Sequence, residues 1–459
     1  MEQITKPHCG ARLDRLPDCR WHSSMFAIVA FGLLVCWSNA VGGLILAQLK
    51  ALGWTDNSTT ATFSAITTAG MFLGALVGGI IGDKTGRRNA FILYEAIHIA
   101  SMVVGAFSPN MDFLIACRFV MGVGLGALLV TLFAGFTEYM PGRNRGTWSS
   151  RVSFIGNWSY PLCSLIAMGL TPLISAEWNW RVQLLIPAIL SLIATALAWR
   201  YFPESPRWLE SRGRYQEAEK VMRSIEEGVI RQTDKPLPPV VIADDGKAPQ
   251  AVPYSALLTG VLLKRVILGS CVLIAMNVVQ YTLINWLPTI FMTQGINLKD
   301  SIVLNTMSMF GAPFGIFIAM LVMDKIPRKT MGVGLLILIA VLGYIYSLQT
   351  SMLLITLIGF FLITFVYMYV CYASAVYVPE IWPTEAKLRG SGLANAVGRI
   401  SGIAAPYAVA VLLSSYGVTG VFILLGAVSI VVAIAIATIG IETKGVSVES
   451  LSIDAVANK

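Results

Sequence analysis

Apolar residues occur in long, almost unbroken runs that are separated by short polar segments. Each run is about as long as the roughly 20 residues that a helix needs to cross a bilayer. The strict alternation of apolar and polar residues that is typical of a transmembrane β-barrel is absent from these runs. The pattern therefore predicts twelve transmembrane helices, at about 25–49, 60–82, 89–108, 113–137, 147–172, 181–202, 265–291, 301–323, 331–349, 353–378, 391–413 and 418–441.

One long hydrophilic stretch, residues 203–264, divides the twelve runs into two groups of six. It contains a charged helical pattern at 214–227 and a proline-rich run at 235–239, a composition typical of a linker. We therefore expect an N-terminal six-helix half at 1–202, a cytoplasmic linker at 203–264, and a C-terminal six-helix half with a short cytoplasmic tail at 265–459.

Composition supports a membrane protein. Apolar residues make up 56% of the chain and charged residues 13%, and the mean hydropathy is +0.71. An ordinary soluble domain has about 25% charged residues, so this balance argues strongly against a soluble enzyme. The seven cysteines show neither a disulfide framework nor the spacing of metal ligands. We expect no cofactor and no metal site.

Basic residues are distributed unevenly around the predicted helices. With the N-terminus inside, 28 of the 33 Lys and Arg residues fall in inner segments and inner helix ends, while three, Lys50, Arg181 and Lys299, fall in outer loops. Cytoplasmic loops carry an excess of Lys and Arg, so both termini are expected in the cytoplasm. The net charge of +8 is then explained by anchors that face anionic lipid, without a nucleic-acid partner.

One charge pattern occurs in both groups of helices. Residues 83–88 (DKTGRR) separate the second and third helices, and residues 324–329 (DKIPRK) separate the eighth and ninth. A glutamate followed by Arg-Gly also occurs twice, at 138–146 after the fourth helix and at 380–390 after the tenth. Two such parallel repeats are typical of transporters that rock two halves around a site near the membrane midplane.

These motifs resemble those of the major facilitator superfamily, in particular its sugar-porter and metabolite-porter branch, over nearly the whole chain. The matching residues are Gly79 to Arg88 (GIIGDKTGRR), Arg118 with Gly122, Gly124 and Gly126, Glu138 with Arg145-Gly146, Pro203 to Leu209 (PESPRWL), Pro379-Glu380, and Glu442-Thr443-Lys444. The resemblance implies an all-α polytopic membrane protein with twelve helices in two pseudo-symmetric six-helix halves. The second half departs from the motifs at two positions: Met320 stands at the position that matches Gly79, and Ile441 stands where the motif has a proline. The pairing of inner-face charges in the second half is therefore left open.

The resemblance also implies roles for charges at the inner face. They would form pairs that latch the inner side while the outer side is open: Asp83, Arg87, Glu138, Arg145, Glu204 and Arg207 in the first half, and Asp324, Arg328, Glu380, Arg389 and Glu442 in the second. Carboxylates and guanidiniums form strong bidentate pairs, and pairs that break in one state bias a two-state equilibrium. The alternative is that these charges serve only to set the topology.

Arg118 lies roughly 7.5 Å below the outer face, at 1.5 Å per residue. The family places its helix on the central cavity, and in proton-coupled relatives this arginine is thought to face an aspartate on helix 1. This chain has Ser38 and Asn39 there instead. Alternatively, Arg118 pairs with outer groups such as Asp112.

Arg399 lies roughly 15 Å from Arg389 along helix 11, near the midplane, and shares a face with Asn395. An arginine at this depth can clamp a carboxylate, unless it makes a structural contact between helices. Two buried arginines without an obvious buried carboxylate favour an anionic substrate. A neutral sugar or polyol is the alternative, because amide and aromatic side chains bind hydroxyls and sugar faces. The candidate substrate-binding residues are Asn39, Arg118, Asn157, Trp158, Gln280, Tyr281, Asn305, Tyr372, Asn395 and Arg399.

Glu95 and His98 are three residues apart in helix 3, so their side chains can meet. They are candidates for proton coupling. Because helix 3 is peripheral in the family, a structural role near lipid headgroups or neighbouring helices is the favoured alternative.

We therefore expect a secondary active or facilitative transporter, such as a symporter, in a bacterial inner membrane. It would move a small polar metabolite, namely a sugar, sugar acid or other organic acid, by alternating access, as a monomer and with a proton as candidate partner. No nucleotide-binding loop or hydrolase motif points to an enzyme. A drug or metabolite exporter of the same fold, or a non-transporting membrane sensor, is the alternative.

Overall fold

The computed structural model describes residues 7–17, 19–35, 38–140, 145–233, 236–240, 253–383 and 386–444, apart from the side chains of residues 133, 134, 137, 145, 146 and 388. Within these residues the chain is almost entirely helical, and no strand occurs in them. Each of the twelve predicted membrane segments is found as one helix or as two or three consecutive helices, except that the last two are the halves of one long helix.

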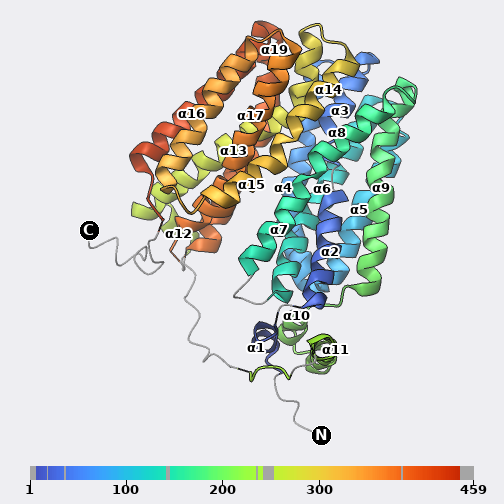
Figure 1. The fold of residues 1–459 in the computed structure, drawn as a ribbon, viewed down its shortest axis with the longest axis vertical. Helices are drawn as coiled ribbons and strands as arrows, with labels where there is room; N and C mark the ends of the chain where they lie inside the picture. The colour runs from blue at the N-terminus through green and yellow to red at the C-terminus, as the bar shows by residue number, and fades with distance from the viewer. Residues whose placement is uncertain are drawn as a thin grey trace. The chain divides into compact units, whose positions relative to one another are not determined.

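The first six segments are α2 (Arg20–Val35) with α3 (Gly42–Ala51), α4 (Asn57–Thr85), α5 (Arg87–Ala106), α6 (Met111–Tyr139), α7 (Arg145–Asn157) with α8 (Ser159–Leu170), and α9 (Ala176–Tyr201) (Figure 1). The next four are α13 (Gly260–Thr293), α14 (Leu298–Met309) with α15 (Gly311–Val322), α16 (Arg328–Ser347), and α17 (Met352–Cys371) with the π-helical η1 (Tyr372–Tyr377) and α18 (Val378–Glu380). The last two are the halves of α19 (Lys387–Ile439), which Gly417 interrupts with a φ of 65°.

Several segments depart from a single straight helix. In the described residues, nine stretches are long and apolar enough to cross a membrane, and the stretch in α19 is long enough for two crossings. The first segment is interrupted between α2 and α3, and the fifth at Trp158 between α7 and α8. Irregular backbone at membrane depth is tolerated where protein buries it or a water-filled cavity exposes it, so these breaks are candidates for functional positions.

The chain forms two compact units that do not coincide with the two halves of the sequence. Unit 1 comprises Met1–Asn39, Gly70–Ser159 and Leu184–Gly246, and unit 2 comprises Ala40–Ala69, Tyr160–Gln183 and Lys247–Lys459. Unit 2 therefore includes the outer parts of four N-terminal membrane segments as well as the last six.

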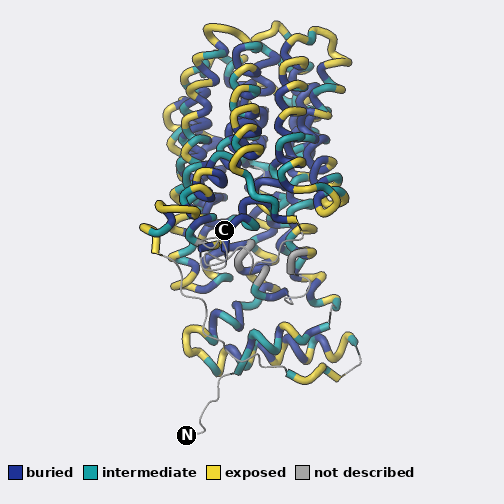
Figure 2. Tube along the Cα trace, turned by 90° about the vertical axis from the view of Figure 1, so that its left-hand side faces the viewer, coloured by how far each residue is buried: buried dark blue, intermediate teal, exposed yellow. Residues whose placement is uncertain are grey.

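Apolar side chains cover both the interior and the lipid-facing surface. In unit 1, a buried cluster joins Val29 of α2, Tyr94 of α5, Leu128 of α6 and Ala198 of α9. Exposed positions follow the outer faces of the long helices (Figure 2), and many of them are large and apolar, such as Leu353. Soluble proteins rarely expose contiguous apolar surface of this extent, so the pattern fits helices whose outer faces contact lipid.

The linker folds into helices that pack on the N-terminus. α11 (Tyr215–Thr233) confirms the predicted charged helical segment at 214–227, and α10 (Pro206–Ser211) is a further helix that was not predicted. Both contact α1 (Cys9–Asp14) (Figure 1). The Glu226 carboxylate accepts hydrogen bonds from Arg12 at 2.6 Å and from Arg15 at 2.7 Å. A second short helix, α12 (Tyr254–Leu257), precedes the seventh segment. We call α1, α10 and α11 the cytoplasmic cap.

The attachment of α1 is expected to weaken in acid. Burial alone would raise the pKa of Glu226, but hydrogen bonds from Arg12 and Arg15 hold it below its usual 4.5. The carboxylate therefore stabilises the cap fully above pH 4.5, and this stabilisation is lost as the pH falls through the lowered pKa. Glu226→Gln should speed amide hydrogen exchange in α1 by about 10-fold at neutral pH. Glu227→Gln, at the exposed neighbouring position, is the control, and equal exchange rates in both variants would contradict the prediction.

Candidate functional site

An arginine at the start of α5 organises the inner face of unit 1. Arg87 donates from Nε to the Glu138 carboxylate of α6 at 2.9 Å and from Nη1 to Asp83 at 2.6 Å. The Glu204 carboxylate accepts the backbone amides of Arg87 at 2.7 Å and Arg88 at 3.2 Å. A carboxylate at a helix N-terminus satisfies amides that have no partner within the helix and complements the helix dipole. One arginine therefore joins the ends of α4, α5 and α6.

Arg328 does the same in unit 2. It donates from Nε and Nη2 to the two oxygens of Glu380, at 3.1 and 3.2 Å, and from Nη2 to Asp324 at 3.1 Å. The Glu442 carboxylate accepts the amides of Arg328 at 2.8 Å and Lys329 at 3.1 Å. The repeat found in the sequence is thus a repeated set of bonds, and the pairing that the departures left open is present in the second half.

Two further pairs of residues belong to this repeat and were missed by sequence reasoning. The Ser205 hydroxyl donates to Glu138, and the Thr443 hydroxyl donates to Glu380 at 2.6 Å. Each hydroxyl directly follows the glutamate that caps the helix, Glu204 or Glu442, and this shared position is the signal that could have revealed it.

The absence of the motif's proline before Glu442 has a simple structural account. In unit 1 the Tyr139 hydroxyl donates to the Pro203 carbonyl at 2.6 Å, and in unit 2 the Tyr377 hydroxyl donates to the Ile441 carbonyl at 3.0 Å. The acceptor is a backbone oxygen in both cases, so isoleucine supplies it as well as proline does.

Two residues of the predicted inner-face set, Arg207 and Arg389, make described contacts outside these clusters. Arg207 was expected among the first-half charges, but it pairs with Asp14 of α1 at 2.9 Å and so belongs to the cytoplasmic cap. Arg389 lies over the ring of Tyr254 of α12, with its guanidinium carbon 5.2 Å from the ring centroid. Arg145 begins α7, but its side chain lies outside the described residues.

Arg118 contacts the break in the first membrane segment and not the outer loops. Its Nη1 donates to the Ser38 carbonyl at 2.7 Å, and the side chain is almost completely buried. The alternative pairing with Asp112 is wrong. Ser38 lies in the turn that precedes α3, outside a helical ladder, so the arginine side chain can satisfy its carbonyl.

Glu95 and His98 are fully buried and so do not lie near lipid headgroups, while the contact of His98 with Ser38 fits the other expected structural role, a pairing with neighbouring helices. His98 Nδ1 lies 3.4 Å from a Glu95 carboxylate oxygen, and His98 Nε2 lies 2.7 Å from the Ser38 hydroxyl. Gly124 of α6 allows this approach, because a Cβ there would lie 3.0 Å from the His98 amide nitrogen. The interior of unit 1 thus does contain a buried carboxylate, contrary to the sequence-based inventory.

In unit 2, the outer ends of the first-half segments pack against second-half helices. Gly43 of α3 lies against α13, where a Cβ would come within 2.4 Å of the Ile284 carbonyl oxygen. The Asn57 amide of α4 donates to Ser414 of α19 at 2.9 Å, and the Asn305 amide of α14 donates to Ser164 of α8 at 3.1 Å. These contacts close the outer ends of the two halves on one another.

Arg399 has one guanidinium nitrogen, Nη1, that is buried and has no hydrogen-bond partner among the described residues. Its neighbour Gly398 lies against α13, where a Cβ would be 3.0 Å from Asn277 Nδ2. One turn further along, Gly402 lies against the ring of Tyr281. Buried polar groups are nearly always paired. Among the predicted substrate ligands, this nitrogen and the hydroxyl of Tyr372 are buried donors with no partner in the described residues, and Arg399 is the one of the two that carries a charge.

The other predicted ligands differ in their exposure. In unit 1, Asn39 and Asn157 are half-buried and Trp158 is exposed at the break between α7 and α8; in unit 2, Gln280 and Tyr281 are half-buried and Asn395 is exposed. Tyr372 is fully buried, and its ring stacks on the ring of Tyr377 with 5.0 Å between the two centroids. The Tyr372 hydroxyl lies against Gly332 of α16. The structure thus places Tyr372 in the packing of the inner face and gives it no accessible surface for a ligand.

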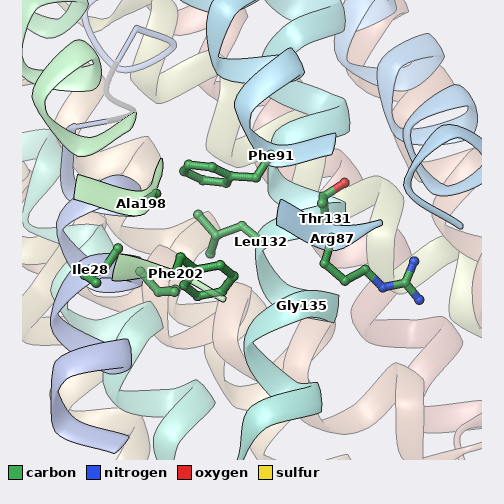
Figure 3. A pocket seen from close by; sticks show the side chains of 9 residues that line it. Ile28, Arg87, Phe91, Thr131, Leu132, Gly135, Ala198 and Phe202 are labelled. Carbon is green, nitrogen blue, oxygen red and sulfur yellow. The ribbon is translucent and has the colours of Figure 1, made fainter. Parts of the chain in front are cut away.

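An apolar cavity in unit 1 is too small for a metabolite. It has a volume of about 20 Å³ and is lined by Ile28, Val29, Arg87, Phe91, Thr131, Leu132, Gly135, Ala198 and Phe202. Figure 3 shows the Arg87 side chain extending away from the aromatic rings of Phe91 and Phe202. A space of this size holds about one water molecule, so it is a packing feature between helices.

Comparison with known proteins decides the family. Residues 24–455 match the model of a family described as "Sugar (and other) transporter". The chain belongs to this family. It is 44% identical over 98% of its length to the inner membrane metabolite transport protein YdjE of Escherichia coli, of which it covers 99%, and 25% identical over 96% of its length to the niacin transporter NiaP of Acinetobacter baylyi, of which it covers 99%. The xylose transporter XylE of E. coli, in a partially occluded inward open structure, superposes with a TM-score of 0.73 at 18% identity, over 93% of this chain and 100% of that one.

The resemblance to the sugar-porter and metabolite-porter branch of the major facilitator superfamily is therefore confirmed, together with the twelve-helix fold. The chain is a multi-pass transporter of a small metabolite in the bacterial inner membrane, and its family consists of transporters, not enzymes.

Proposed function

We propose that this transporter carries a small organic acid in its ionised form and that Arg399 binds the carboxylate. The observation that carries the proposal is the buried Nη1 of Arg399, which has no partner in the described part of the chain and lies roughly 15 Å along α19 from Arg389. An arginine in the hydrocarbon region is costly and marks a substrate pathway by default. A carboxylate offers two oxygens that match the planar guanidinium fork, and it neutralises the charge.

Arg118 is less suited to this role, although the sequence placed both arginines together as substrate ligands. Its Nη1 already holds the Ser38 carbonyl, and the buried carboxylate of Glu95 lies in the same group of contacts through His98 and Ser38. We therefore assign the anion to Arg399 alone. The name of the Acinetobacter relative, a niacin transporter, supports an acid, because niacin is a pyridine carboxylic acid.

A neutral sugar is the second candidate. It is favoured by the half-buried Gln280 and Tyr281 on α13, which offer a donor, an acceptor and an aromatic face. It is also favoured by the name of the structural relative, a xylose transporter. The two candidates differ in what they need from Arg399, since a hydroxyl group does not require a guanidinium partner.

The Arg399→Lys variant separates them. Lysine keeps the charge but loses the bidentate geometry, so the apparent affinity for an acid should fall at least about 10-fold, which is about 1.4 kcal/mol. Uptake of a panel of radiolabelled sugars, sugar acids and aromatic acids into proteoliposomes is the measurement. Arg265→Lys is the matched control, because Arg265 is a buried arginine near the inner end of α13. Unchanged affinity of the Arg399→Lys variant for every transported acid would contradict the proposal.

We further propose that the clusters around Arg87 and Arg328 act as paired inner-face latches. Each arginine joins three helix ends, and each glutamate cap ties the following segment to it. The support for this role is the recurrence of the whole set of bonds in both units. Alternating access would then require these bonds to loosen as the inner side changes shape.

A further inference from the structure

Glu95 and His98 place an acid and a base in contact within a fully buried part of the membrane-spanning region. Ionisable groups at such a position are expensive to keep and mark ion or proton pathways. We propose that this pair binds the proton that the transporter couples to its substrate, and that Ser38 passes the protonation state of the pair to the break in the first membrane segment. The inference rests on the proposed transport of an acid.

Ser38 is the physical link. Its hydroxyl lies 2.7 Å from His98 Nε2, and its carbonyl accepts the hydrogen bond of Arg118 at 2.7 Å. It stands in the interval between α2 and α3, where the backbone is not held by a continuous helical ladder. One residue in the turn before α3 therefore contacts both the proton-binding pair and the buried arginine.

Protonation reverses the hydrogen bond at Ser38. Without the proton, neutral His98 directs Nδ1–H toward the Glu95 carboxylate and accepts the Ser38 hydroxyl hydrogen at Nε2. With a proton on Nε2, the imidazolium donates to the hydroxyl oxygen, and the Ser38 hydrogen must turn to another acceptor. We assign the proton to the Glu95 and His98 pair as a whole, because the two side chains are in contact.

The charges around the pair favour joint binding of a proton and an anion. The elements packed against α5 are α2, α4, α6 and α9, and Arg118 of α6 is the charged group that shares Ser38 with the pair. Other charged or titratable groups in the described parts of these elements lie toward helix ends: Arg20, His22, Asp83, Lys84, Asp112, Cys117, Glu138, Tyr139, Glu177, Arg181, Arg200 and Tyr201. Deprotonated Glu95 and Arg118 sum to zero charge, so the added proton gives the group a charge of +1. A substrate anion offsets this charge, which couples the two bindings.

The first test needs no substrate, because the probe is the proton. Infrared difference spectra of the full chain in lipid vesicles, taken between about pH 5 and pH 8, report protonation of buried carboxylates and imidazoles. We expect a titrating carboxyl band that disappears in Glu95→Gln and whose midpoint shifts by about one pH unit or more in His98→Gln. Asp112→Asn, an exposed carboxylate on α6, should leave the band unchanged. A band that persists in Glu95→Gln, or no titrating band in the unaltered protein, would overturn the proposal.

The second test asks whether the proton drives transport. For an acid found by the uptake panel, Glu95→Gln and Ser38→Ala should retain exchange of internal for external substrate but lose accumulation driven by a pH gradient. Ser38→Ala should also retain the titrating band, since it removes the link and leaves the pair intact. Accumulation that remains unchanged in both variants would refute the coupling. Should the unaltered protein transport no acid, the proposed substrate class fails, while the infrared result still decides whether the pair binds a proton.

Discussion

Replacing Gly43 with tryptophan should abolish net transport. A Cβ at Gly43 would lie 2.4 Å from the Ile284 carbonyl oxygen and 2.9 Å from that of Asn285. Both neighbours are backbone atoms, so the collision cannot be relieved by a rotamer change. The indole would force α3 away from α13 and prevent the outer ends from closing. Alternating access requires that closure. A packed interface has discrete arrangements and does not deform continuously, so a partly closed state is not available. We therefore expect uptake into proteoliposomes to fall by at least about 100-fold.

Gly169→Trp is the matched control for this prediction. Gly169 is also a helical glycine of unit 2, in α8, and a Cβ there meets nothing within 4 Å. The control should fold and transport nearly as well as the unaltered protein. The prediction fails if Gly43→Trp transports as well as Gly169→Trp, because the close packing of α3 on α13 would then have no part in the cycle.

Replacing Gly126 with valine should prevent unit 1 from folding stably. A Cβ at Gly126 of α6 would lie 2.1 Å from the Met71 carbonyl oxygen of α4. Gly74 of α4 makes the reciprocal approach, with a Cβ position 2.0 Å from the Val123 carbonyl oxygen. Two backbones in direct contact leave no space for a side chain. The expected loss of stability is on the order of 4 kcal/mol, which is exceptional for one substitution.

The thermal unfolding temperature of the purified protein in detergent measures this effect. Gly79→Val in α4 provides the control, because a Cβ at Gly79 meets nothing within 4 Å. Replacing glycine with valine changes the intrinsic helix propensity by the same amount in both helices. A difference in unfolding temperature between the two variants therefore reports the close contact between α4 and α6. Similar unfolding temperatures for the two variants would contradict the account of the crossing.

Much of the architecture follows from features that act locally along the chain. Burial in lipid requires long apolar helices, so the twelve segments and the linker helix α11 could be placed from apolar runs and one charged interval. Gly124, Gly126, Gly398 and Gly402 lie at close helix contacts, where a missing side chain leaves room for the neighbouring segment. The break at Ser38 could not be predicted, since no proline or charge stands there, whereas Pro161 in the first turn of α8 is a signal for the break at Trp158 that sequence reasoning missed.

The site was predictable where a repeat constrained it. The bonds from Arg87 to Glu138 and from Arg328 to Glu380 recur because the same residues stand at the same helix ends. Arg207 lacked such a constraint, and its partner Asp14 lies almost two hundred residues away in the sequence. The burial of Glu95 and His98 depends on which face α5 turns to its neighbours, and a segment that is apolar on most sides gives little indication of that face.

The central claim is that this protein transports an organic acid and requires its charge. The most direct measurement is uptake into proteoliposomes, with an imposed pH gradient, of carboxylic acids that are each paired with the corresponding uncharged amide. The account predicts that at least one acid accumulates and that its amide is taken up at least about 10-fold more slowly, since the amide cannot neutralise Arg399. Equal uptake of an acid and its amide, or accumulation of neutral sugars with no flux of any acid, would contradict it.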